Sequence, residues 1–188
     1  MANDPLSIDC SSTRVLRGPN VHADVTCLEA TLTVSVPEKY SLHFLAGRLA
    51  QVLPESAWAM AGELRQGQAS DLTVARLVAR ATIGIQQDLG AQVSFCDVQP
   101  TSTPGEFVVV VQYSEEGSGK SSLALALRLV RDPMQPSDDE LFETLRQLRN
   151  AHEDERLGPS TGGIAAAAAR RGIPFSRINQ GSFVRLGQ

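Results

Sequence analysis

Apolar and polar residues alternate along several short stretches of the chain, which is the pattern of strands buried on one face. Residues 27–36 alternate in this way, are rich in β-branched side chains and are followed by Pro37. They therefore predict a strand that ends at the proline. The apolar runs at 92–98 and 106–113 predict two more strands. Because the turn-forming segment QPTSTPG joins these two runs, we expect them to pair antiparallel.

Apolar residues at helical spacing predict five helices. The longest is expected at 70–90, where Ser70 or Asp71 suits the N-cap and Gly90 the C-terminal stop. The other four are expected at 41–54, 119–131, 137–150 and 164–172. The stripe of the first of these ends at Pro54 and consists of Leu42, Leu45, Leu49, Val52 and Leu53. Residues 173–188 predict two short strands around a Gln180-Gly181 turn.

Together these elements predict an α+β fold, with a mixed sheet, several packed helices, and a final helix followed by a short β-hairpin. We expect residues 1–12 to be a disordered lead-in. Residues 13–150 are expected to form the main domain, and residues 151–188 a linker helix and hairpin. A length of 188 residues, with 42% hydrophobic and 20% charged residues, fits one globular domain with a small appendage.

Composition limits the kinds of partner and the cellular compartment that we expect for the protein. The net charge of -4 argues against general nucleic-acid binding, and the longest apolar stretches are too short to cross a membrane. The three cysteines are far apart and form no CxxC pair, which favours a reducing compartment over a disulfide framework or a zinc knuckle. The N-terminus lacks the basic-then-apolar pattern of a signal peptide. We therefore expect a cytoplasmic protein with no nucleic-acid or membrane partner.

The stretch YSEEGSGKSSLALALRLV at 113–130 has the outline of a nucleotide-binding P-loop. A P-loop needs a glycine, four further residues and then Gly-Lys-Ser/Thr. GSGKSS supplies the second half, but the position of the first glycine is Ser114, and Glu115 and Glu116 would repel a phosphate. The stretch therefore predicts a turn into a helix, with Ser118 as its cap and no nucleotide site.

The histidines do not predict a metal or catalytic centre. His22, His43 and His152 have no HxxxH or HxxEH spacing among them, and the chain has no GxSxG motif. His43 lies near an apolar helical stripe, which favours a partly buried, hydrogen-bonded imidazole. His152 lies in the acidic stretch NAHEDER, which favours a solvated helix end.

Two longer segments are more specific. RVLRGPNVHADVTCLEA at 14–30 and ERLGPSTGGIAAAAARRGIPFSRINQGSFVRLG at 155–187 resemble the N-terminal domain of cyanophycin synthetases. The segment TSTPGEFVVVVQYSEEGSGKSSLALALRLV between them looks like the strand, acidic turn and helix of the same family. The resemblance extends over nearly the whole chain and is strongest at its two ends. It is fairly specific because three separated motifs occur in order.

The resemblance implies a domain without catalysis of its own that binds cyanophycin or shorter Asp-Arg oligomers. In the family, ATP-grasp and Mur-ligase-like domains use ATP and Mg²⁺ to extend this polymer, which has a poly-aspartate backbone bearing arginine side chains. Neither ligase domain is present in this sequence, so we expect no cofactor in this chain. A fragment of a longer synthetase, a stand-alone protein and a homo-oligomer all stay open.

Some family members also carry a metallopeptidase-like site on an HxxEH helix, where it cuts polymer into primers. By the same resemblance, those positions fall on Arg76, Ala79 and Arg80, and a downstream acidic position falls on Gly84. Arginine stays protonated and offers no lone pair to a metal, so we expect this site to be lost. Arg76, Arg80 and Arg17 are instead candidates for binding polymer carboxylates. The plainer alternative is solvated or ion-paired surface arginines.

Two other functions stay open. One is a hydrolase whose metal site uses unmatched residues such as His22, His43 or glutamates. The other is an interaction protein that keeps the fold but binds a partner synthetase in place of the polymer.

Overall fold

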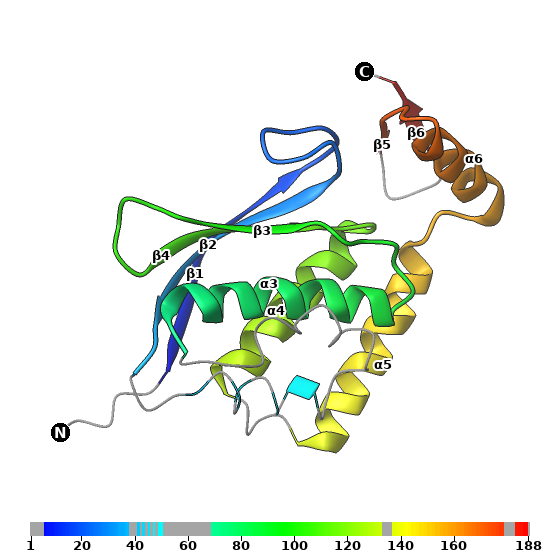
Figure 1. The fold of residues 1–188 in the computed structure, drawn as a ribbon. Helices are drawn as coiled ribbons and strands as arrows, with labels where there is room; N and C mark the ends of the chain where they lie inside the picture. Colours follow the sequence, from blue (N-terminus) through cyan, green and yellow to red (C-terminus); the bar gives the residue numbers. More distant parts are fainter. Residues whose placement is uncertain are drawn as a thin grey trace.

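A four-stranded antiparallel sheet forms one layer of the protein, with helices on one of its faces (Figure 1). The computed structural model describes residues 6–37, 69–132, 137–178 and 183–187, and also positions 41, 43, 45, 47, 49 and 50. The sheet has the order β1-β2-β4-β3. Its strands are β1 (Ser7–Leu16), β2 (Cys27–Ser35), β3 (Cys96–Pro100) and β4 (Glu106–Gln112). The α+β class is confirmed, but the sheet is not mixed, since every neighbouring pair of these strands runs antiparallel.

One face of the sheet carries the hydrophobic core. The inward residues of the central strand β2 are Leu28, Ala30, Leu32 and Val34, all at most 2% exposed. They alternate with the more polar Glu29, Thr31 and Thr33, as expected for a strand with one buried face. On β4 the core face is formed by Phe107, Val109 and Val111. The half-buried strand predicted from the alternation in 27–36 is therefore confirmed.

Helices α3 to α6 and a small hairpin are the other elements labelled in Figure 1. Helix α3 (Asp71–Asp88) packs on β2, β3 and β4, and helix α4 (Glu116–Arg131) packs on α3 and reaches β1. Helix α5 (Asp138–Glu155) packs on α4. Helix α6 (Pro159–Arg170) contacts the small hairpin of β5 (Phe175–Arg177) and β6 (Val184–Leu186). Figure 1 shows this last unit at one end of the molecule, beside the loop between β1 and β2.

The predicted ends of the longest helix are confirmed. The Ser70 side chain accepts a hydrogen bond from the backbone of Thr73, and Thr73 bonds back to Ser70, so the two form a capping box. The chain leaves the helix at Gly90, whose φ of +92° favours glycine. Near this end the buried Gln86 donates to the carbonyl of Gln112, at 2.9 Å, and so ties α3 to β4.

The expected disorder of residues 1–12 is wrong from Ser7 onward, because Ser7–Leu16 forms β1. Backbone pairing along β2 holds this strand, with a register shift between Cys10 and Ser12. Residues 9–14 are all exposed, so the strand has no apolar alternation that would reveal it in the sequence. Its first part is anchored instead by Leu6 and Ile8, which are 4% and 0% exposed.

The remaining predicted helices and strands are found with shifted ends. Helices α4, α5 and α6 begin at 116, 138 and 159, and α5 continues to 155, past the expected boundary at 150. The antiparallel pairing of β3 with β4 and of β5 with β6 is confirmed. The Gln180-Gly181 turn lies outside the described residues.

The first predicted helix is described only in part. Positions 43, 45, 47, 49 and 50 are helical, and Leu45 and Leu49 are buried as the stripe predicts. Leu42, Val52, Leu53 and the end at Pro54 lie outside the described residues. Within the part of the chain that the structure describes, no helix is both long and apolar enough to cross a bilayer.

Candidate functional site

The start of α4 carries a carboxylate at the place where a P-loop would hold phosphate. A P-loop holds phosphate at the N-terminus of the following helix. Here that position is taken by the carboxylate of Glu155, which accepts a hydrogen bond from the backbone N–H of Ser118 at 3.2 Å. A side chain at Gly117 would overlap this carboxylate. The Glu155 carboxylate thus occupies the place where a nucleotide phosphate would bind. Its negative charge is stabilised by the positive end of the helix dipole.

Ser118 is not the cap of this helix, as the sequence suggested. The N-cap is Glu115, and Ser118 lies inside the first turn with its side chain buried. Its hydroxyl pairs with Nδ1 of His152 at 3.0 Å. His152 is 2% exposed, so the expectation of a solvated histidine at a helix end is also wrong. Its position in an acidic stretch did not reveal that the imidazole points at α4.

Burial lowers the pKa of His152, and the nearby guanidinium of Arg156 lowers it further. Since the unfolded chain has a histidine pKa near 6.5, it takes up a proton before the folded protein does as the pH falls. The folded state should therefore be most stable above pH 6.5 and lose stability below it, down to the lowered pKa. Thermal unfolding between pH 7.5 and 5 should show this loss, and the His152→Gln variant should show a flatter profile. Equal slopes for the two proteins would contradict the assignment.

His43, by contrast, is exposed on its helix, so the expected partly buried imidazole is wrong. His22 lies in the loop between β1 and β2 and contacts Glu29, with 2.9 Å between its Nε2 and the carboxylate. Arg14 bonds the other oxygen of Glu29, at 2.8 Å from its Nε. Although burial raises the pKa of Glu29, the bonds from His22 and Arg14 outweigh it and hold that pKa below its usual value. Arg14 and His22 thus have structural partners.

The RGPN segment forms the turn that follows β1. Gly18 has a φ of +98°, a backbone conformation that suits glycine. The Asn20 side chain donates to the carbonyls of Gly18 and Val25 and accepts from the backbone of His22 and Ala23. The segment is therefore a turn that ends β1, and Asn20 is the residue that holds the turn together.

Arg17, one of the three arginines proposed from the sequence, is ion-paired. Its Nη2 lies 2.8 Å from the carboxylate of Glu116 at the start of α4, and Lys120 bonds the other oxygen of that carboxylate at 2.7 Å. The bonds from Lys120 and then from Arg17 hold the pKa of Glu116 below its usual value. The pair is largely exposed, so it is worth little in stability. It does fix the direction of the Arg17 side chain.

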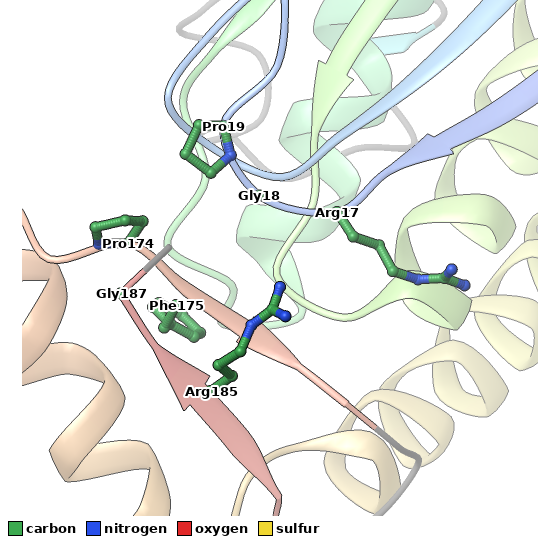
Figure 2. Close-up of a pocket in the computed structure, with 7 residues that line it drawn as sticks. All are labelled: Arg17, Gly18, Pro19, Pro174, Phe175, Arg185 and Gly187. Carbon is green, nitrogen blue, oxygen red and sulfur yellow. The ribbon is translucent and has the colours of Figure 1, made fainter.

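A cavity of about 310 Å³ lies between the RGPN turn and the C-terminal hairpin (Figure 2). Its lining residues come from the two segments that carry the sequence motifs: Arg17, Gly18, Pro19, Pro174, Phe175, Arg185 and Gly187. None of them is acidic, and two are arginines. Sequence reasoning did not single out Arg185, because no local pattern shows that β6 faces a turn more than 150 positions earlier in the chain.

Arg76 and Arg80 do not line this cavity. They lie one turn apart on α3, with Arg76 exposed and Arg80 partly buried. Neither forms a hydrogen bond or an ion pair with any residue in the described parts of the chain. The structure therefore brings Arg17 near Arg185 but leaves the Arg76 and Arg80 pair as a separate cationic face.

The four positions to which the resemblance assigns the metal site of some family members all lie on α3. Ala79 is 1% exposed and Gly84 is also buried, so both belong to the core side of α3. Among the residues that the structure describes, no three His, Cys, Asp or Glu side chains gather closely enough to hold a metal ion.

Comparison with known proteins identifies relatives for part of the chain, although no family model matches it. Cyanophycin synthetases of Trichormus variabilis and a Nostoc species are each 31% identical to it over 114 residues, and that of a Synechocystis species is 32% identical. The match covers 59% of this chain, less than the motifs suggested, and only 13% of each relative. It falls on the N-terminal domain of those enzymes. The resemblance is therefore confirmed over that part of the chain, which is similar to the N-terminal domain of those enzymes.

Proposed function

We propose that this protein is a docking domain for cyanophycin and has no catalytic activity of its own. It binds the arginine-aspartate polymer and presents it to ATP-dependent ligase domains, which belong either to the same longer chain or to a partner synthetase. ATP and Mg²⁺ act in those domains. The observation that carries the proposal is the arginine-lined cavity between the two segments that first indicated the relationship.

The chemistry of the described surfaces supports binding. The polymer bears carboxylates, and arginine is the side chain best suited to hold a carboxylate through two parallel hydrogen bonds. The cavity offers Arg185, and α3 offers Arg76 and Arg80. The relatives with 31–32% identity are named for synthesis of this polymer, which favours it over other anionic chains.

The same residues argue against a peptidase. Arg76, Ala79, Arg80 and Gly84 offer no metal ligand at the positions where the resemblance implies one. His22 and His152 bond to Glu29 and Ser118, respectively. These two imidazoles therefore already have partners within the fold.

The first test of the function is sedimentation of the purified chain with insoluble cyanophycin granules at low and high salt. We expect the protein to pellet with the granules at low salt and less at high salt, because ionic screening weakens contacts between exposed charges. The supernatant should contain no released oligomers.

The other outcomes separate the alternatives. Release of oligomers, together with stoichiometric metal in the protein, would favour the hydrolase. Absence of pelleting, with co-purification of a synthetase, would favour a protein that binds the enzyme in place of the polymer. Pelleting that does not change with salt would contradict a charge-based contact.

Arg76 and Arg80 provide a second, independent prediction. Like charges at this spacing on a helix are unfavourable by roughly 0.2–0.5 kcal/mol, and no described residue offsets them by an ion pair. If they contact the polymer, the double variant Arg76→Ala/Arg80→Ala should bind granules several-fold more weakly at low salt. The matched control is Arg170→Ala/Arg171→Ala, which removes the same charge from an exposed place at the end of α6. Equal binding by the two double variants would remove Arg76 and Arg80 from the contact surface.

A further inference from the structure

The cavity between the RGPN turn and the C-terminal hairpin has two unlike walls. One wall is the turn itself, at Arg17, Gly18 and Pro19, and the other is formed by Pro174, Phe175, Arg185 and Gly187 of the hairpin. A volume of about 310 Å³ is at the lower end of the range for small-molecule sites. It suits one short unit of a chain better than a long stretch.

Only one of the two arginines is available to a ligand. In Figure 2 the Arg17 side chain points away from Phe175 and Arg185, and its guanidinium is bound by Glu116. Arg185 extends toward the turn, and its guanidinium forms no hydrogen bond or ion pair with a described residue. The cavity thus combines a cation that has no ion-pair partner among the described residues with a lining, as described, that contains no acidic side chain.

The remaining lining is apolar. Phe175 is half-buried and stands beside Pro174, opposite Pro19. An aromatic face next to prolines accepts methylene groups and also the flat face of a guanidinium, which stacks on aromatic rings. A ligand that carries a carboxylate and an arginine-like arm could therefore satisfy both parts of the cavity at once.

We propose that this cavity is a carboxylate-binding subsite for one repeat of an arginine-aspartate chain. Arg185 holds the carboxylate through its guanidinium, and Phe175 contacts the arginine arm of the same repeat. The proposal rests on the proposed docking function and assigns it a place and a gripping residue.

The test measures binding of a synthetic tetramer of the aspartate-arginine repeat to the whole chain by calorimetry. We expect Arg185→Gln to bind it at least about tenfold more weakly, because a charge-assisted hydrogen bond is lost. Arg185→Lys should recover only part of the affinity, because lysine keeps the charge but not the planar fork. Phe175→Leu should weaken binding less than Arg185→Gln. Arg170→Gln removes the same charge outside the cavity lining and should bind like the unchanged protein.

The second probe is the same tetramer with its carboxylates converted to amides. Its affinity for the unchanged protein should be as low as the affinity of the first probe for Arg185→Gln. Equal affinity for the two probes would overturn the subsite, and so would equal affinities of Arg185→Gln and Arg170→Gln for the first probe. If granules still pellet with the protein in that case, the docking function stands and its contact surface lies elsewhere. If the unchanged protein binds neither tetramer nor granules, the docking function fails together with the subsite.

Discussion

Replacing His152 by alanine should lower the free energy of unfolding by about 2–4 kcal/mol. The imidazole is 2% exposed and fills the space between α5 and α4. Its removal leaves a cavity and also deprives the buried hydroxyl of Ser118 of its partner. Chemical denaturation followed by circular dichroism measures the change, which should appear as a lower midpoint with the same slope.

The matched control is His43→Ala, which removes an exposed imidazole from another helix. A surface substitution of this kind should change stability by less than about 0.5 kcal/mol. Equal stability of the two histidine variants would contradict this prediction. It would mean that His152 behaves as a solvated residue at a helix end and that its contact with Ser118 does not contribute to the free energy of unfolding.

Replacing Gly119 by alanine should destabilise the protein by about 1–3 kcal/mol, the usual cost of adding atoms to a packed interior. A Cβ at this position would lie 2.7 Å from the Cβ of Tyr113 and 3.4 Å from a methyl group of Leu28. Tyr113 is 6% exposed, and burial raises the pKa of its hydroxyl to about 12. Because the clash involves the first side-chain atom of Tyr113, no rotation of the ring relieves it, and α4 must move away from the sheet.

Gly163→Ala is the control for this change. Gly163 lies inside α6, and nothing approaches within 4 Å of a Cβ built there. Alanine should stabilise that helix by roughly 0.5–1 kcal/mol, because it costs less conformational entropy than glycine. The melting temperatures of the two variants should therefore move in opposite directions. A neutral Gly119→Ala would mean that the glycine of GSGKSS is not needed for packing.

These two predictions concern parts of the chain whose sequence suggested something else. GSGKSS has the outline of a phosphate loop, yet Gly117 and Gly119 make room for Glu155 and Tyr113. NAHEDER has the composition of a solvated helix end, yet it supplies His152 to the interior and Glu155 to the start of α4. In both cases the decisive partner comes from a distant part of the chain.

The local sequence correctly predicted α3 with Ser70 as one of two candidate caps, a half-buried strand at β2 and the final hairpin, and the turn-forming linker correctly predicted the pairing of β3 with β4. These features depend on which side chains of one element face the same way, a relation that the local sequence contains. The first part of β1, up to Ser12, was predicted to be disordered because its residues are mostly polar. Residues 9–14 are exposed in the structure, and pairing with β2 holds them in the sheet.

For the candidate site, too, some features could be predicted from the sequence and others could not. The relationship to the synthetases and the incomplete P-loop are evident from the residues alone, whereas the loss of a metal site at Arg76, Ala79 and Arg80 stays a prediction. The binding of Arg17 by Glu116 and the position of Arg185 beside the RGPN turn, in contrast, follow from packing in three dimensions. The physical reason is that a side chain's partners depend on how separate elements pack. Residues far apart in the chain come into contact only when the elements pack, and a local pattern of apolar and polar positions does not predict those contacts.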